Sequence, residues 1–271
     1  MGKVENNFAV GSVSKHIINL AVPMIVAQLI NVLYNVVDRI YIGRIPGEAT
    51  LAMGGLGLCL PLISIINAFA NLFGVGGAPL CSIARGRGDN EEAEKIMGNS
   101  FMLLIIFSVV LMVVGFIFKE DLLWLFGASA NTIGYANDYM TIYLLGTLFV
   151  LIGLGMNSFI NSQGFAKIGM LTVLLGAVTN IILDPIFIFC FDLGVQGAAV
   201  ATVISQFVSA LWTLQFLTSK KTILKIKRSC LKLKYNYVIR IVSLGMAGFM
   251  MAITNSIVSI VCNATLQQYG G

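Results

Sequence analysis

Hydrophobic residues form long uninterrupted runs along this chain, and charged residues are confined to the segments between the runs. Residues 102–118 and 140–160 contain no charged side chain, whereas residues 85–95 and 220–240 are rich in them. About 20 apolar residues in a helix cross the hydrocarbon core of a bilayer, so the pattern predicts membrane-spanning helices joined by loops. We expect about seven spans, at residues 17–42, 51–77, 96–118, 138–160, 169–190, 197–217 and 238–264.

Composition supports the same class of protein. Hydrophobic residues make up 58% of the 271 residues and charged residues 11%, against about 25% charged residues in soluble domains. The first apolar run lacks a small-x-small cleavage site, so we interpret it as a retained span rather than a cleaved signal. The sequence therefore predicts an all-α, multi-pass protein of the cell membrane, surrounded by the lipid bilayer.

Basic residues are distributed unequally between the two sets of predicted loops. With a cytoplasmic N-terminus the outer side holds only Arg39, Arg44 and Lys119, and this asymmetry favours that orientation. The inner side then holds Lys3, Lys15, Arg85, Arg87, Lys95, Lys167, Lys220, Lys221, Lys225, Lys227, Arg228, Lys232, Lys234 and Arg240.

Several function classes are disfavoured by what the sequence lacks. The net charge of +5 follows the loops and forms no aromatic-interleaved basic face, so we expect no nucleic-acid partner. The five cysteines have no metal-ligand spacing, and neither a phosphate-binding loop nor a hydrolase motif is present. We therefore expect neither an enzyme nor a resident cofactor or metal.

Two predicted loops contain local signals. Residues 122–126, behind three charges, predict a short helix in the membrane interface with Trp124 at headgroup level. Asp89, with Glu92 three residues later, predicts a capping box that opens the third span.

Two carboxyl groups, those of Asp38 and Asp184, lie inside predicted spans. A charge in hydrocarbon is costly, so an acidic residue there is a candidate functional residue. In the first span Gln28, Asn31, Asn35 and Asp38 follow spacings of three, four and three, which places them on one helix face that we expect to be turned away from lipid.

The fifth and sixth spans carry similar stripes. Asn180 and Asp184 are four residues apart, and Pro185 frees the carbonyl one turn earlier, so we expect a kink there. Thr202 and Gln206 share a face of the sixth span together with Ser209 and Thr213.

The three stripes are predicted to meet in the membrane. At 1.5 Å per residue Asp38, Asp184 and Thr202 each lie roughly 10 Å from the outer boundary. Two carboxyl groups in one water-poor cavity form a natural proton carrier, and with Asn and Thr oxygens they could instead hold Na⁺. The alternatives are an interfacial Asp38 that is hydrated or paired with Arg39, and a purely structural contact of Asp184 between helices.

The first and seventh predicted spans resemble each other weakly. Aligning Leu20 with Leu244 places Asn31 on Asn255. This is the alignment expected if a second copy of the helical repeat begins after six helices. We therefore predict a six-helix lobe at 1–217, a basic cytoplasmic loop at 218–237, and the first helix of a truncated second lobe at 238–271.

Specific motifs run through the whole chain. The segments are 20–23, 38–43, 74–76, 84–89, 125–129 and 135–139, and the most specific are 180–185 (Asn-Ile-Ile-Leu-Asp-Pro) and 194–202. In these segments the sequence resembles the multidrug and toxic compound extrusion (MATE) transporters.

The resemblance implies two six-helix lobes, a MATE-type fold, and an antiporter that exports organic cations or drug-like molecules in exchange for H⁺ or Na⁺. In the DinF-like branch, acids of the first and fifth helices form a cation site, and the matching residues are Asp38, Asn180, Asp184 and Thr202. Cavity-lining residues are then expected at Gln28, Asn31, Asn35, Asn157 and Gln206. The seventh helix carries Asn255 and no carboxylate, which favours this branch over the NorM-like one, and Asn161 departs from the basic residue of many members.

Two further function classes stay open at this point. One is a lipid-linked saccharide flippase of the same superfamily, which a cavity lined by Arg and Lys would favour. The other is a membrane subunit that does not transport. If the chain is a fragment of an exporter, we expect function to require the second lobe.

Overall fold

The computed structural model describes residues 12–269, and every regular element in that range is a helix. The elements are α1 (Val13–Ile42), α2 (Ala49–Gly86), α3 (Asn90–Leu125), α4 (Ile133–Leu145), α5 (Thr147–Ser162), α6 (Ala166–Pro185), the π-helix η1 (Ile186–Cys190), α7 (Gly194–Thr218), the 3₁₀ helix η2 (Arg228–Cys230) and α8 (Tyr235–Tyr269). The predicted all-α membrane fold is confirmed.

Six helical segments in this range are long and apolar enough to cross a membrane: α1, α2, α3, α6 with η1, α7 and α8. The remaining predicted span consists of α4 and α5, which meet at Gly146 with a bend of 59°. A Cβ atom at Gly146 would lie 2.6 Å from Cγ2 of Val203, so this bend packs directly against α7. The predicted number of seven spans is reached when the bent pair counts as one.

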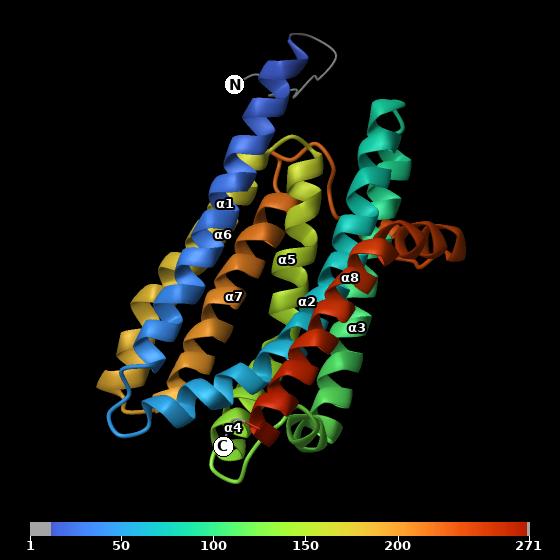
Figure 1. Cartoon of the computed structure of the whole chain (residues 1–271). Helices are drawn as coiled ribbons and strands as arrows, with labels where there is room; N and C mark the ends of the chain where they lie inside the picture. Colours follow the sequence, from blue (N-terminus) through green and yellow to red (C-terminus); the bar gives the residue numbers. More distant parts are fainter. Residues whose placement is uncertain (1–11, 270–271) are drawn as a thin grey trace.

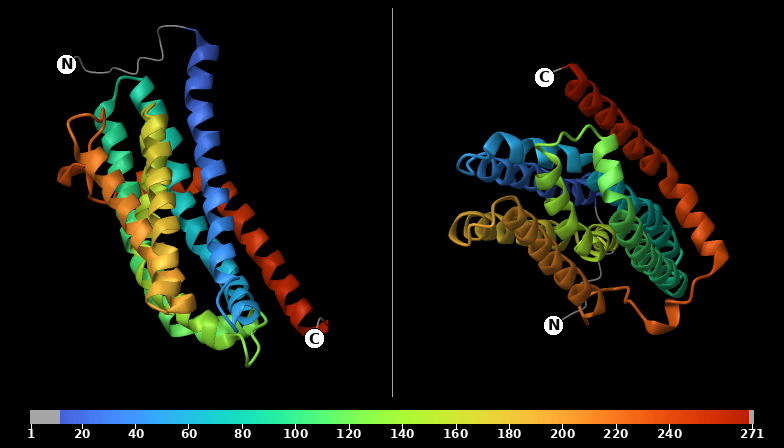
Figure 2. Two further views of the ribbon diagram at one scale, coloured as in Figure 1. Left: turned by 90° about the vertical axis from the view of Figure 1, so that its left-hand side faces the viewer. Right: turned by 90° about the horizontal axis from the view of Figure 1, so that it is seen from below.

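The helices form a bundle in which α1 runs along α6 at one edge and α8 runs obliquely across α2 (Figures 1 and 2). The crossing of α2 and α8 is a backbone-to-backbone contact. A Cβ atom at Gly76 would meet the Ile241 carbonyl oxygen, and one at Gly245 would meet the Leu72 carbonyl oxygen. Because only glycine allows this approach, Gly76 and Gly245 set the contact between the two helices.

A continuous apolar core joins α2, α3, α4 and α5. Phe73, Leu104, Met140 and Phe159 are among its fully buried side chains. The outer faces of α1, α3 and α8 instead expose many large aliphatic side chains, as surfaces in contact with lipid tails do.

The expected interfacial helix around Trp124 is wrong, because residues 122–125 are the last turn of α3. Lys119 and Glu120 are good helix formers, so these charges do not interrupt the helix. Trp124 is nevertheless exposed at that end of the bundle.

The expected capping box is half present. The Asp89 side chain accepts a hydrogen bond from the Glu92 backbone N–H at 2.8 Å, which caps α3. The Glu92 carboxylate does not complete the box, because it pairs with Arg240 of α8 at 2.9 Å.

The turns rich in basic residues, between α2 and α3, α5 and α6, and α7 and α8, lie together at the upper end of the bundle in Figure 1. Lys3 lies outside the described residues. The side of the membrane on which this end lies stays a prediction.

Candidate functional site

The two predicted carboxyl groups come together where α1 packs along α6. Asp38 is in the last turns of α1 and is 9% exposed, and Asp184 is in the last turn of α6 and is fully buried. Their side chains are within hydrogen-bonding and electrostatic range of each other. Asp38 is thus largely enclosed, and none of the three salt bridges among residues 12–269 pairs it with Arg39, although the Arg39 charge is within electrostatic range.

Asn180 connects this carboxyl pair to α7. Its Nδ2 donates to Asp184 Oδ1 at 3.1 Å and lies 3.5 Å from Thr202 Oγ1. Both Asn180 and Thr202 are buried. The four residues Asp38, Asn180, Asp184 and Thr202, which we call the carboxyl cluster, thus come from α1, α6 and α7 and occupy one place, as their depths along the predicted spans indicated.

Three oxygens of the carboxyl cluster accept no hydrogen bond from any described residue. They are Asp38 Oδ1, Asn180 Oδ1 and Asp184 Oδ2. Buried polar atoms are nearly always paired, and an unpaired buried carboxylate is costly. These unpaired oxygens therefore suit a proton or a small cation shared between them.

The proline next to the carboxyl cluster changes the helix type. After Pro185 the chain continues as the π-helix η1, in which the Phe191 N–H donates to the Ile186 carbonyl oxygen at 3.0 Å. Single π-helical turns of this kind are frequent at functional sites.

Tyrosines also belong to the site, although the sequence analysis did not identify them. Tyr139 of α4 is buried, lies beside the Thr202 side chain, and stacks on Tyr143 with ring centroids 6.0 Å apart. Tyr34 of α1 is electrostatically close to both carboxyl groups. Tyr139 and Tyr143 are four residues apart in a predicted span, and this spacing is the signal that could have identified them.

A polar cavity of about 130 Å³ lies beside the cluster, between α1, α5, α6 and α7. Asn31, Asn157 and Gln206 line it, as expected. Gln28 and Asn35 do not line it and are exposed on α1, so their role as cavity-lining residues stays a prediction. They are exposed because α1 packs mainly against α6 alone, which leaves its flank uncovered in this chain.

A larger pocket of about 440 Å³ lies elsewhere, near the end of α8. Its lining includes Ser129, Thr132 and Asn263, and no residue of the carboxyl cluster. The larger pocket is therefore separate from the carboxyl cluster.

Comparisons with known proteins show which chains this one is similar to. Multidrug export protein MepA of Staphylococcus saprophyticus is 30% identical over 263 residues, which are 97% of this chain and 58% of MepA. MepA of Staphylococcus aureus strain MRSA252 is 27% identical over the same shares. The chain thus spans 58% of the length of these curated relatives.

Solved structures show the same fold. An outward-facing conformation of a multidrug resistance MATE family transporter of the MOP superfamily is similar at a TM-score of 0.84 and 28% identity, covering 91% of this chain and 54% of that chain. An inward-facing conformation with the same family description is similar at 0.84 and 26% identity, covering 94% and 58%.

The sequence model of the MatE family matches residues 23–186, which include Asp38, Asn180 and Asp184. This match spans more than half of the chain, and the curated relatives and the solved structures agree with it. The chain belongs to the MatE family of membrane transporters.

Proposed function

We propose that this chain is the ion-coupling part of an antiporter that exports organic cations and drug-like molecules across the cell membrane in exchange for H⁺ or Na⁺. The observation that carries the proposal is the carboxyl cluster, with two neighbouring buried carboxyl groups and three unpaired oxygens. The relatives support the exporter class, since their names describe multidrug export. Membership of the DinF-like branch and the use of H⁺ or Na⁺ as the coupling ion are parts of the same proposal.

The chemistry of the cluster explains why an ion would be coupled to shape. Two adjacent carboxylates repel each other in a water-poor site, and one proton or one Na⁺ between them removes the repulsion. Asp38 is on α1 and Asp184 is on α6. An ion bound between the two carboxyl groups therefore acts directly on the contact between these helices. An ion shifts a conformational equilibrium only when it binds one state more tightly, and a gap that opens or closes between two carboxyl groups supplies this difference.

The flippase alternative is less well supported by the cavity. All the residues that line the cavity beside the cluster are uncharged, and a site for a phosphate-linked saccharide needs Arg or Lys. A membrane subunit that does not transport would have no need for unpaired carboxyl oxygens in its interior.

The test is Asp184→Asn, which keeps the size of the side chain and removes its ability to ionise. Dye efflux would be measured in cells that express the chain from its native gene. Na⁺ binding and proton release would be measured on the purified chain. Asp138→Asn is the matched control, because Asp138 is an exposed carboxylate bonded to Gln196 at 3.0 Å. Unimpaired efflux and ion binding of the Asp184 variant at normal expression would overturn the proposal.

A further inference from the structure

The connection between α7 and α8, residues 219–234, carries a dense positive charge. It contains six lysines and one arginine and no acidic residue: Lys220, Lys221, Lys225, Lys227, Arg228, Lys232 and Lys234. We call it the basic linker. A segment with this composition is usually mobile because it cannot bury enough apolar surface, but here three buried side chains of the bundle hold its backbone.

The first of these side chains is Gln163, at the end of α5. Its Oε1 accepts hydrogen bonds from Thr222 Oγ1 at 2.7 Å, from the Ile223 N–H at 3.1 Å and from the Leu224 N–H at 2.8 Å. Gln163 is fully buried. The start of the linker is therefore fixed to the bundle at three points by one amide.

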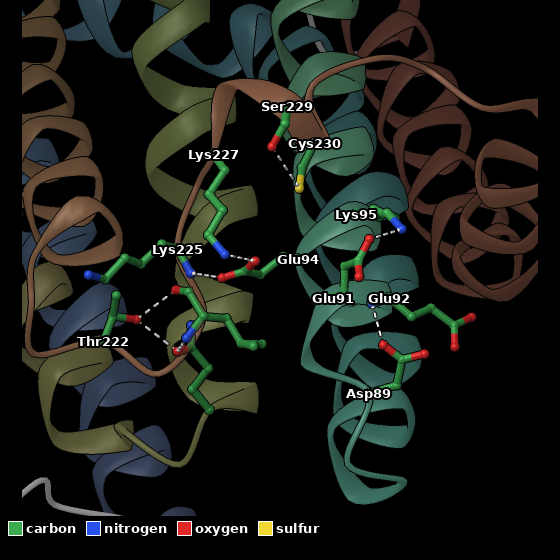
Figure 3. Close-up of polar contacts among 12 residues, drawn as sticks. Asp89, Glu91, Glu92, Glu94, Lys95, Thr222, Lys225, Lys227, Ser229 and Cys230 are labelled. Carbon is green, nitrogen blue, oxygen red and sulfur yellow. Dashed lines mark hydrogen bonds and ion pairs between the residues drawn. The ribbon is translucent and has the colours of Figure 1, made fainter.

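The other two side chains are on α3. Glu94 accepts a hydrogen bond from the Lys225 N–H at 3.2 Å and forms a salt bridge with Lys227 at 2.5 Å (Figure 3). Asn99 Oδ1 accepts a hydrogen bond from the Lys234 N–H at 2.8 Å. Both side chains are buried, so the middle and the end of the linker are fixed as well.

The α3 backbone also receives the linker directly. A Cβ atom at Gly98 would meet the Cys230 carbonyl oxygen, so a larger residue at this position would push the linker away. Leu224 and Cys230 of the linker are buried against the bundle. One side of the linker is thus apolar and packed.

The basic side chains are on the other side. Lys220, Lys221, Lys227 and Arg228 are exposed, as are Lys232 and Lys234. Among the described residues only Lys227 of these seven has a salt-bridge partner, and its hydrogen bond and charge interaction with Glu94 hold the pKa of the Lys227 ammonium above its usual value. In Figure 3 the Lys225 side chain extends away from Glu94. Six positive charges are therefore carried on a fixed backbone without a carboxylate to neutralise them.

The position of the linker places these charges at the membrane surface. It connects the ends of two membrane-spanning helices, α7 and α8. Its contacts on α3 run from Glu94 to Asn99, within roughly 14 Å of the start of that helix at 1.5 Å per residue. This is the depth of lipid headgroups rather than of hydrocarbon.

We propose that the basic linker is a binding surface for the headgroups of anionic phospholipids. Lysine and arginine beside a membrane contribute about fivefold in affinity for anionic lipid per residue, so even partial engagement of six charges gives marked enrichment. The fixed backbone adds to this, because the positive charges are already in place before a lipid binds. The packed inner side keeps them directed towards the headgroup layer.

The test measures which lipids remain on the purified chain. The protein would be placed in nanodiscs of phosphatidylcholine with 30% phosphatidylglycerol, and bound lipid would be quantified by mass spectrometry. The variant replaces Lys220, Lys221, Lys225 and Arg228 by Gln, and we expect at least about a fivefold loss of phosphatidylglycerol enrichment. The double variant Lys220→Gln with Lys221→Gln should lose less, and its matched control is Arg44→Gln with Lys119→Gln at the opposite end of the bundle.

Two further arms separate the explanations. Replacing chloride by inorganic phosphate at equal ionic strength should not displace the lipid, and strong displacement would assign the surface to free phosphate instead. Gln163→Ala keeps every charge but releases the start of the linker, so it should also lower enrichment. Unchanged enrichment in the fourfold variant, or an equal loss in the Arg44 and Lys119 control, would overturn the proposal.

Discussion

Two groups of buried polar side chains in this protein are built in opposite ways. The group of Gln163, Glu94 and Asn99, which holds the basic linker, has its carbonyl and carboxylate oxygens occupied by backbone N–H donors. In the carboxyl cluster three buried oxygens have no donor among the described residues. The first group is satisfied by the chain itself, and the second leaves its bonding capacity for something else.

We infer from this difference a structural role for the first group and the proposed ion-binding role for the second. Burial and polarity are the same in both places, so neither property alone identifies a site. What distinguishes the carboxyl cluster is that two neighbouring carboxyl groups and an amide keep unused oxygens in one place, whereas the other unpaired buried atoms of the described residues, such as Thr213 Oγ1, belong to uncharged side chains. Changes in the linker group should therefore affect stability, and changes in the carboxyl cluster should affect ion coupling.

The largest expected effect is on transport. Asp184→Asn should reduce ion-driven dye efflux to the background, because the neutral amide can neither bind a proton at this position nor balance the charge of a cation. The measurement is efflux from energised cells at matched expression. Asp138→Asn should leave efflux intact, and a partial effect shared by both variants would contradict a specific role.

A loss of stability is expected next, from the linker group. Gln163→Leu removes the acceptor of two backbone N–H groups and one hydroxyl, and each buried donor left unpaired costs about 1–3 kcal/mol. The linker can partly rehydrate, so we expect a loss of roughly 2–4 kcal/mol in the free energy of unfolding. Denaturant titration in detergent measures it.

The control for that variant is Gln215→Leu, the same change at an exposed position of α7. Its effect should stay within about 0.5 kcal/mol. Equal losses at the two positions would mean that the bonds of Gln163 to the linker have no special weight.

The third prediction concerns the sign of a change in stability. Without Na⁺ and at high pH, Asp184→Asn should leave the free energy of unfolding unchanged or raise it by about 1 kcal/mol, because it removes repulsion between two buried carboxylates. The same denaturant titration measures it. A loss of stability as large as that of Gln163→Leu would place Asp184 with the structural group.

The smallest effect is expected at the edge of the cluster. Thr202→Val removes one oxygen near Asn180 and keeps the shape, so ion affinity should fall about fivefold, equivalent to about 1 kcal/mol. Isothermal titration of the purified chain measures it. Thr213→Val, a buried hydroxyl further along the same helix, should leave ion affinity as it is.

The sequence predicted those parts of the molecule that follow a local period. The spans were visible as apolar runs, and Asp38, Asn180, Asp184 and Thr202 were visible as polar residues on helix faces at similar depth. Their meeting followed from helix geometry alone, since each helix must cross the same layer.

Other parts of the molecule depend on contacts that leave no periodic pattern in the sequence. The bend at Gly146 depends on the close contact with Val203, and the role of Gln163 depends on backbone groups about 60 residues further along the chain. Tyr139 was missed because a tyrosine in a span reads as an apolar residue until its position beside Thr202 is seen. Gln28 and Asn35 are exposed although they share a helix face with Asn31, because a shared helix face does not say what covers it.

The glycine contact between α2 and α8 has a mechanical consequence. By sequence, α8 follows the linker and would be counted with a second half of the molecule, yet Gly76 and Gly245 bring its backbone against α2. Side chains hold the same crossing on either side of the glycines, because Phe249 of α8 packs edge-on against Phe69 of α2 with ring centroids 4.9 Å apart, and Asn263 Nδ2 donates to the Gly57 carbonyl oxygen at 3.4 Å. The crossing therefore fastens α8 to the described bundle, and a larger residue at Gly76 or Gly245 would have to push the two helices apart.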